Sequence, residues 1–129
     1  MGPFKTAAIA ILAVFAPIQA VIVSVGVLVA ADMITGIWAA HKQSKSITSA
    51  GLRRTVSKLI IYQVAILSGF LVEHYLAGDI VPIVKLIGGV IGMVELKSIL
   101  ENVNVINGVD IFKSVLQKLG SQNDKPNGN

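Results

Sequence analysis

Two charged side chains interrupt long apolar stretches and are the residues best placed for chemistry inside a membrane. Asp32 is the only charge in residues 6–40, and Lys85 stands alone in a later apolar run. An ionised carboxylate in hydrocarbon costs about 2.5–3.5 kcal/mol. Asp32 therefore indicates a polar contact in an oligomer, a group lining a water-filled lumen, or a span that begins later. Lys85 either pairs with Asp32 or Glu95, or extends its long side chain to the headgroups.

No combination of residues predicts a catalytic or metal site. Cysteine is absent, and there is no phosphate-binding glycine loop, HExxH or serine nucleophile elbow. His41 and His74 are expected on opposite sides of the membrane, so they cannot share a metal. Glu73 and His74 are adjacent near a predicted helix end, where anchoring at the interface is favoured over a proton relay. The sequence predicts a protein without enzymatic activity or cofactor.

The composition predicts a membrane protein. Of 129 residues, 53% are hydrophobic and 14% charged, with mean hydropathy +0.74, whereas soluble domains carry about 25% charged residues. A chain this short cannot bury so much apolar surface in one core. Much of its surface must therefore face lipid.

The apolar runs predict an all-α integral membrane bundle. We expect three full transmembrane helices near residues 20–40, 59–77 and 80–100, and a short apolar helix over 4–16. Pro17 is expected to break the first run, because proline removes a helix hydrogen bond. Whether the short helix crosses the membrane is open. A cleaved signal peptide is an alternative, although apolar sequence continues past the potential cleavage site.

The end of the chain is predicted to be a separate region. The membrane domain is expected to cover 1–108, and 109–129 to form an amphipathic helix, closed by Gly120, and a disordered cytoplasmic tail. The apolar residues of the helix over 109–119 fall on one face: Ile111, Phe112, Val115, Leu116 and Leu119.

The polar segment between the first two spans is strongly basic. Residues 41–58 contain five cations and no acid, namely Lys42, Lys45, Arg53, Arg54 and Lys58. Under the positive-inside rule this loop should stay in the cytoplasm, which places the turn at residues 78–79 outside. No aromatic residues are interleaved with the cations, so anionic lipids are favoured as partners over nucleic acid.

Small residues four positions apart predict close helix contacts. Such spacing lets two backbones approach without obstruction by side chains. The pattern occurs in three spans, at Gly36 and Ala40, Ala65 and Gly69, and Gly88 and Gly92. It does not distinguish packing within one chain from packing between copies.

Several segments resemble the toxin-secretion/phage-lysis holin family. The residues are Asp32-Met-Ile-Thr-Gly36-Ile-Trp-Ala-Ala, then Ser49-Ala-Gly51-Leu-Arg-Arg-Thr-Val-Ser-Lys58, and an acidic motif with Glu95, Ser98, Glu101 and Asn102. Residues 107–111 also resemble the following family segment, although members often have proline where Phe112 stands. The resemblance covers about residues 30–119.

The resemblance implies a bacteriophage holin. Such a protein would accumulate as a homo-oligomer in the bacterial cytoplasmic membrane, open lesions at a programmed time, and release an endolysin without necessarily contacting it. Two other functions stay open. One is a small transporter or channel subunit that uses Asp32 and Lys85, and the other is a membrane anchor that recruits a partner through its tail.

Overall fold

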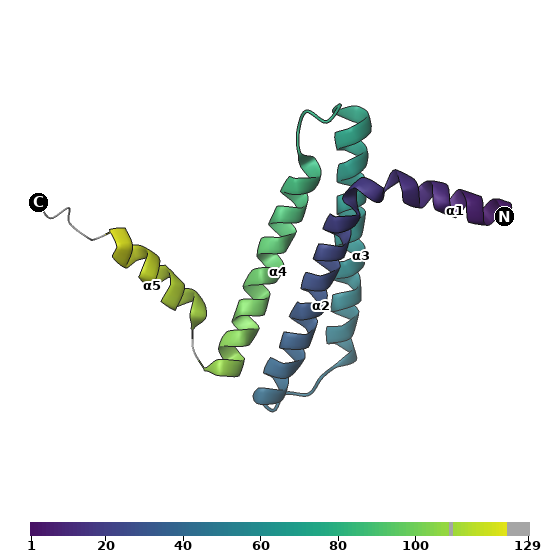
Figure 1. The fold of residues 1–129 in the computed structure, drawn as a ribbon. Helices are drawn as coiled ribbons and strands as arrows, with labels where there is room; N and C mark the ends of the chain where they lie inside the picture. Colours follow the sequence, from purple (N-terminus) through teal and green to yellow (C-terminus); the bar gives the residue numbers. More distant parts are fainter. Residues whose placement is uncertain (109, 124–129) are drawn as a thin grey trace, which may run out of the picture.

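The computed structural model describes residues 1–108 and 110–123, and all regular structure in these residues is helical. Figure 1 shows three long helices side by side, with a shorter helix projecting from each end. The long helices are α2 (Gln19–Lys42), α3 (Ser49–Leu71) and α4 (Ile83–Asn107). The projecting helices are α1 (Pro3–Val14) and α5 (Ile111–Asn123). The predicted all-α class is confirmed.

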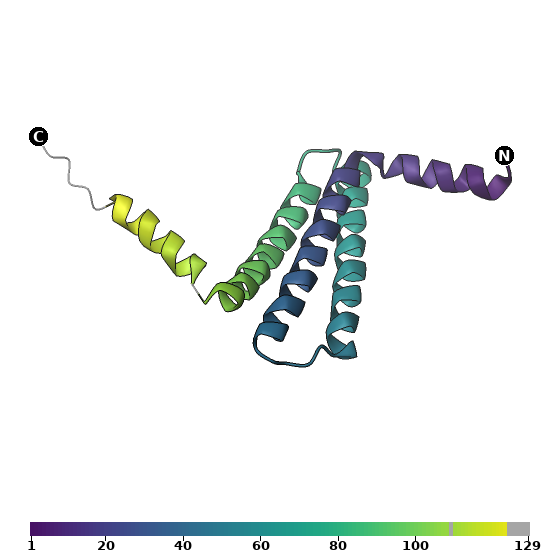
Figure 2. The same cartoon turned by 60° about the horizontal axis from the view of Figure 1, so that its bottom comes forward.

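The break expected near Pro17 is present. α1 ends at Val14, and a 3-10 turn over Ala16–Ile18 contains the proline and leads into α2. With 12 residues, α1 is about 18 Å long, which is too short to cross about 30 Å of hydrocarbon. It projects sideways at the end of the bundle where α3 connects to α4 (Figures 1 and 2).

The basic segment is mostly helical, not a loop. α2 continues to Lys42, and Thr48 begins α3 by accepting a hydrogen bond from the Gly51 N–H to its Oγ1 at 3.3 Å. Only residues 43–48 connect the two helices. Of the cations assigned to the loop, only Lys45 lies in this connection. Lys42 ends α2, and the other three lie in α3: Arg53, Arg54 and Lys58.

The predicted turn at residues 78–79 joins α3 to α4. A π-helical turn, Val72–Leu76, ends α3, and Gly78 and Asp79 both have positive φ. Oε2 of Glu73 accepts the N–H of Val84 at 2.7 Å, which satisfies a free donor in the first turn of α4. Glu73 thus fixes a helix end, and its expected anchoring at the membrane interface stays a prediction.

By length and composition, two helical segments can cross a membrane, Ala16–Lys42 and Ser49–Leu76. α4 has a suitable length but does not meet the same criterion, because every 18-residue stretch of it carries at least three charged residues. Three full spans are therefore not confirmed. The boundaries also differ from the expected 80–100, since α4 begins at Ile83 and continues to Asn107.

Hydrogen bonds link the end of α4 to the first turn of α5. Gly108 ends α4 with a left-handed φ of 66°, a conformation that suits glycine. Oδ1 of Asn104 accepts the N–H of Ile111 at 2.8 Å, and Oδ1 of Asp110 accepts the N–H of Lys113 at 3.1 Å. α5 continues through Gly120, so the expected helix end there is wrong. Val109, the Phe112 side chain and residues 124–129 of the predicted tail lie outside the described part.

A narrow apolar core holds the long helices together. α4 packs mainly along α2, and α3 contacts both. The buried cluster consists of Ile18, Val25, Val29, Ile66, Phe70, Val84 and Ile91. Large apolar side chains on the outer faces of the same helices are exposed. This surface is the one expected of helices that face lipid.

Candidate functional site

A cluster of ionisable side chains joins the three long helices. Nζ of Lys58 on α3 lies 2.8 Å from Oδ2 of Asp32 on α2 and 2.9 Å from Oε2 of Glu95 on α4. The hydroxyl of Tyr62 donates to Oε1 of Glu95 at 2.8 Å. We call these four residues the ion cluster. Each long helix contributes to it.

Burial makes these contacts important. The Glu95 side chain is 0% exposed, whereas Asp32 and Lys58 are 15% and 25% exposed. A buried carboxylate is tolerated only if it is paired and hydrogen-bonded, and both oxygens of Glu95 have a partner. With each group in its usual ionisation state, the ion cluster contains two anions and one cation. It therefore keeps one uncompensated negative charge.

A neutral hydrogen-bond network extends the ion cluster along α2 and α4. Nδ2 of Asn102 donates to Oδ1 of Asp32 at 3.1 Å and to Oγ1 of Thr35 at 3.1 Å. Gly36 lies beside this network, and a Cβ added there would be in ordinary contact with that Asn102 nitrogen at 3.5 Å. The small residue predicted to allow helix contact therefore faces the amide of α4.

The spacing of these residues explains why they converge. Lys58 and Tyr62 are four residues apart, and Glu95 and Asn102 are seven apart, so each pair lies on one helix face. Sequence reasoning singled out Asp32 and Glu95 but missed Tyr62 and Thr35, and it did not pair Lys58 with either acid. The i,i+4 spacing of Lys58 and Tyr62 at the start of an apolar run was the available signal.

The other residues of the acidic motif have different surroundings. Ser98 lines a pocket of about 620 Å³ together with Asp32 and Asn102. Glu101 lies outside the ion cluster, with Oε1 3.6 Å from Nζ of Lys97 in an exposed pair. Such exposed pairs contribute little to stability. The motif thus separates into an inward face and an outward face of α4.

Lys85 is not part of the ion cluster. It is exposed on α4 and lines a shallow apolar groove with residues of α2 such as Ser24. Asp32 and Glu95 both bind Lys58 instead, so of the two alternatives for Lys85 the pairing with Asp32 or Glu95 is wrong. No ion pair to Lys85 occurs within residues 1–108 and 110–123.

The predicted small-residue faces contact helices of the same chain. A Cβ added at Gly69 would lie 2.6 Å from Cδ1 of Ile87, and one at Gly88 would lie 3.0 Å from Cγ1 of Val21. At Gly92 the nearest atom, on α2, is 3.7 Å away. Ala65 and Ala40 are both partly buried. These contacts account for the close packing of α4 against its neighbours.

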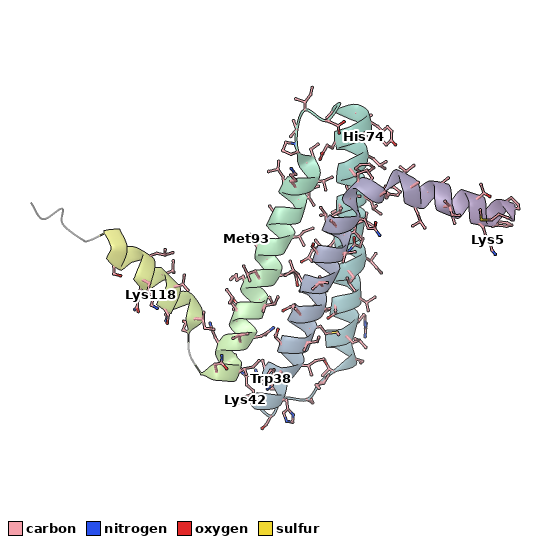
Figure 3. All side chains as sticks on the ribbon, in the orientation of Figure 1. Lys5, Trp38, Lys42, His74, Met93 and Lys118 are labelled. Atoms are coloured by element: carbon pink, nitrogen blue, oxygen red, sulfur yellow. The ribbon has the colours of Figure 1, made fainter. Side chains whose placement is uncertain are left out.

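Four exposed cations from residues 42–54 gather at one end of the bundle. Lys42 lies at the end of α2 (Figure 3), and Lys45, Arg53 and Arg54 are exposed in the connection or in the first turns of α3. Figure 3 also places His74 at the opposite end, beside the α3–α4 turn. Nδ1 of His74 is 3.2 Å from Oδ2 of Asp79. The basic residues and the acidic turn are thus separated by the length of the long helices.

The geometry defines a class of protein. Within the described residues, no group of three or more His, Cys, Asp or Glu side chains could hold a metal ion. The ion cluster ties helices together through contacts that strengthen in apolar surroundings. These features define a small helical membrane protein whose polar groups connect its helices.

Comparison with known proteins gives the family. The chain belongs to the bacteriophage holin family, which matches residues 9–122. No curated protein matches it, and neither does any solved structure. The family consists of pore-forming membrane proteins, generally without enzymatic activity, and implies the bacterial inner membrane and a role in phage lysis. The suspected family is confirmed.

Proposed function

We propose that this protein is a holin that assembles in the bacterial cytoplasmic membrane and opens lesions through which an endolysin reaches the cell wall. The observation that carries the proposal is the family match over residues 9–122. The two apolar helices and the lipid-compatible outer surface support it. The timing of lysis would then follow from how readily copies assemble.

The proposed topology has α4 as a third span. Its 25 residues correspond to about 38 Å, and it packs along α2 over much of this length. The buried Glu95 faces Lys58 and Tyr62 of the ion cluster and not lipid, which lowers the free-energy cost of inserting α4 into the membrane. The basic end of the bundle would face the cytoplasm, in contact with anionic lipid headgroups.

We propose that the ion cluster keeps the three helices together until copies associate. The contacts of Gly69, Gly88 and Gly92 are made within one chain, which favours other exposed surfaces for the first association of copies. If the helices separate when a lesion opens, Asp32 and Glu95 can then line water. This sequence of events preserves the lumen role expected for Asp32.

Inducible expression in bacteria tests the proposal. A holin should give a delay and then abrupt collapse of the membrane potential, with lysis when an endolysin is co-expressed. Ile66→Asp is a suitable control, because Ile66 is a 0% exposed residue in the apolar part of α3 and a carboxylate there should oppose insertion of α3 and abolish the collapse at equal expression. Solute-dependent flux without collapse would indicate a transporter, and neither effect would indicate an anchor.

A further inference from the structure

α5 presents an apolar face that nothing in the described chain covers. Val115, Leu116 and Leu119 are 49%, 52% and 59% exposed. The three residues lie on one side of the helix because they are separated by one, three or four positions. An exposed apolar stripe on a short helix marks a surface for interaction.

The position of α5 is set by the preceding connection. The hydrogen bonds of Asn104 and Asp110 hold the first turn of α5 against the end of α4. The α4–α5 connection lies at the same end of the bundle as the basic residues around Lys42 (Figures 1 and 3). In the proposed topology, α5 therefore starts at the cytoplasmic surface of the membrane.

The charge of α5 complements an anionic surface. Residues 111–123 contain two lysines, Lys113 and Lys118, and no acid. The Lys113 side chain is 78% exposed and lies 3.7 Å from Asp110, an exposed pair that leaves the ammonium group accessible. Amphipathic helices with lysines beside an apolar face bind in the plane of anionic membranes.

We propose that α5 docks on the cytoplasmic leaflet, with Val115, Leu116 and Leu119 in the acyl boundary and Lys113 and Lys118 on lipid phosphates. This inference goes beyond the proposed function but depends on its topology. The membrane is the favoured occupant because, in the proposed topology, α5 starts at the lipid surface. A second copy would have to bring two positively charged helices together.

The test uses the full chain, which has no cysteine, reconstituted in vesicles. An environment-sensitive fluorophore is attached to Val115→Cys on the apolar face, and in a second sample to Gln117→Cys, two residues away. The vesicles contain phosphatidylcholine with or without phosphatidylglycerol, and aqueous iodide is present on both sides. Because the long helices keep the chain in the vesicle, the signal reports on α5 alone.

If α5 docks, the fluorescence emission of the label at position 115 should be blue-shifted and protected from quenching by iodide only in anionic vesicles. The emission of the label at position 117 should still be quenched by iodide. Lys113→Gln with Lys118→Gln should lower the docking constant by about 30-fold, since each cation near the surface contributes about fivefold. The control Lys5→Gln with Lys97→Gln removes the same charge elsewhere and should change nothing.

Two results would overturn the proposal. One is equal quenching of both labels in anionic vesicles. The other is protection that is the same in neutral vesicles and rises with protein density, which would indicate a second copy. Release of a trapped dye from the same vesicles is measured separately. Permeabilisation without protection at position 115 would reject the docking of α5 and leave the holin function standing.

Discussion

Replacing Lys58 by methionine should destabilise the bundle strongly. Methionine keeps the length and apolar character of the lysine stem but removes the ammonium group that lies between Asp32 and Glu95. Glu95, which is 0% exposed, would retain only its hydrogen bond from Tyr62. We therefore expect the main cost to come from Glu95, because the other carboxylate is partly exposed.

The expected size follows from this burial. Breaking a buried ion pair by removing one partner costs about 3–5 kcal/mol, because the remaining charge is left without compensation. Adding Glu95→Gln to Lys58→Met removes that charge and should recover at least about 2 kcal/mol as a coupling energy. Lys97→Met is the matched control. Its partner Glu101 is exposed at 3.6 Å, so we expect a loss within about 0.5 kcal/mol.

The free energy of unfolding can be measured by titrating dodecyl sulfate into mixed micelles. Energy transfer between dyes on engineered cysteines in α2 and α4 reports separation of the helices, because these helices contact each other directly. In cells, Lys58→Met should shorten the delay before the membrane potential collapses. If Lys58→Met costs no more than Lys97→Met, the ion cluster does not hold the helices together and the reasoning fails.

Three further predictions concern other parts of the chain. Cysteines introduced at Ser46 and Asp79 should differ in their labelling by an impermeant thiol reagent in intact spheroplasts, with position 79 labelled and position 46 unlabelled. Labelling of position 46 alone would reverse the topology. Gly69→Leu should cost about 1–3 kcal/mol in the dodecyl sulfate assay, as overpacking does, whereas Gly26→Leu, with no atom within 4 Å, should be neutral; equal losses would contradict the packing. Glu73→Ala should cost about 0.5–2 kcal/mol, the range for a lost helix cap, with faster amide exchange in the first turn of α4; unchanged exchange would exclude the cap.

The sequence was sufficient for the helices that local signals delimit. The apolar run over 20–40 placed α2, Pro17 marked the break after α1, and residues 78–79 marked the turn. These features depend on neighbouring residues only. The expected span over 59–77 gave the existence of α3 but not its bounds, since α3 runs from Ser49 to Leu71. The end of α5 was missed because glycine weakens a helix by only about 1 kcal/mol, and the helix continues through Gly120.

The candidate site could be predicted only in part. Asp32 and Glu95 stand out because a lone acid in apolar sequence is costly. Their partner could not be identified, because Lys58 and Lys85 are both cations near span boundaries. Which cation reaches Asp32 depends on how α3 and α4 are shifted lengthwise against α2, and this shift is set by long-range packing such as the contact of Gly88 with Val21. The spacing of apolar residues within one helix carries no information on how far that helix is shifted lengthwise against its neighbours.

The position of the ion cluster along the helices also fixes a hydrophobic thickness. Between Lys58 and Glu73, α3 and the start of the π-helical turn have 14 uncharged residues, or about 21 Å. Between Gln19 and Asp32, α2 has 12, or about 18 Å. A bilayer with about 30 Å of hydrocarbon must therefore become thinner around the protein, or the ion cluster must lie within the hydrocarbon, below the lipid headgroups. Longer lipid acyl chains raise the free energy of either arrangement, so membrane thickness itself becomes a variable that controls how stable the closed bundle is.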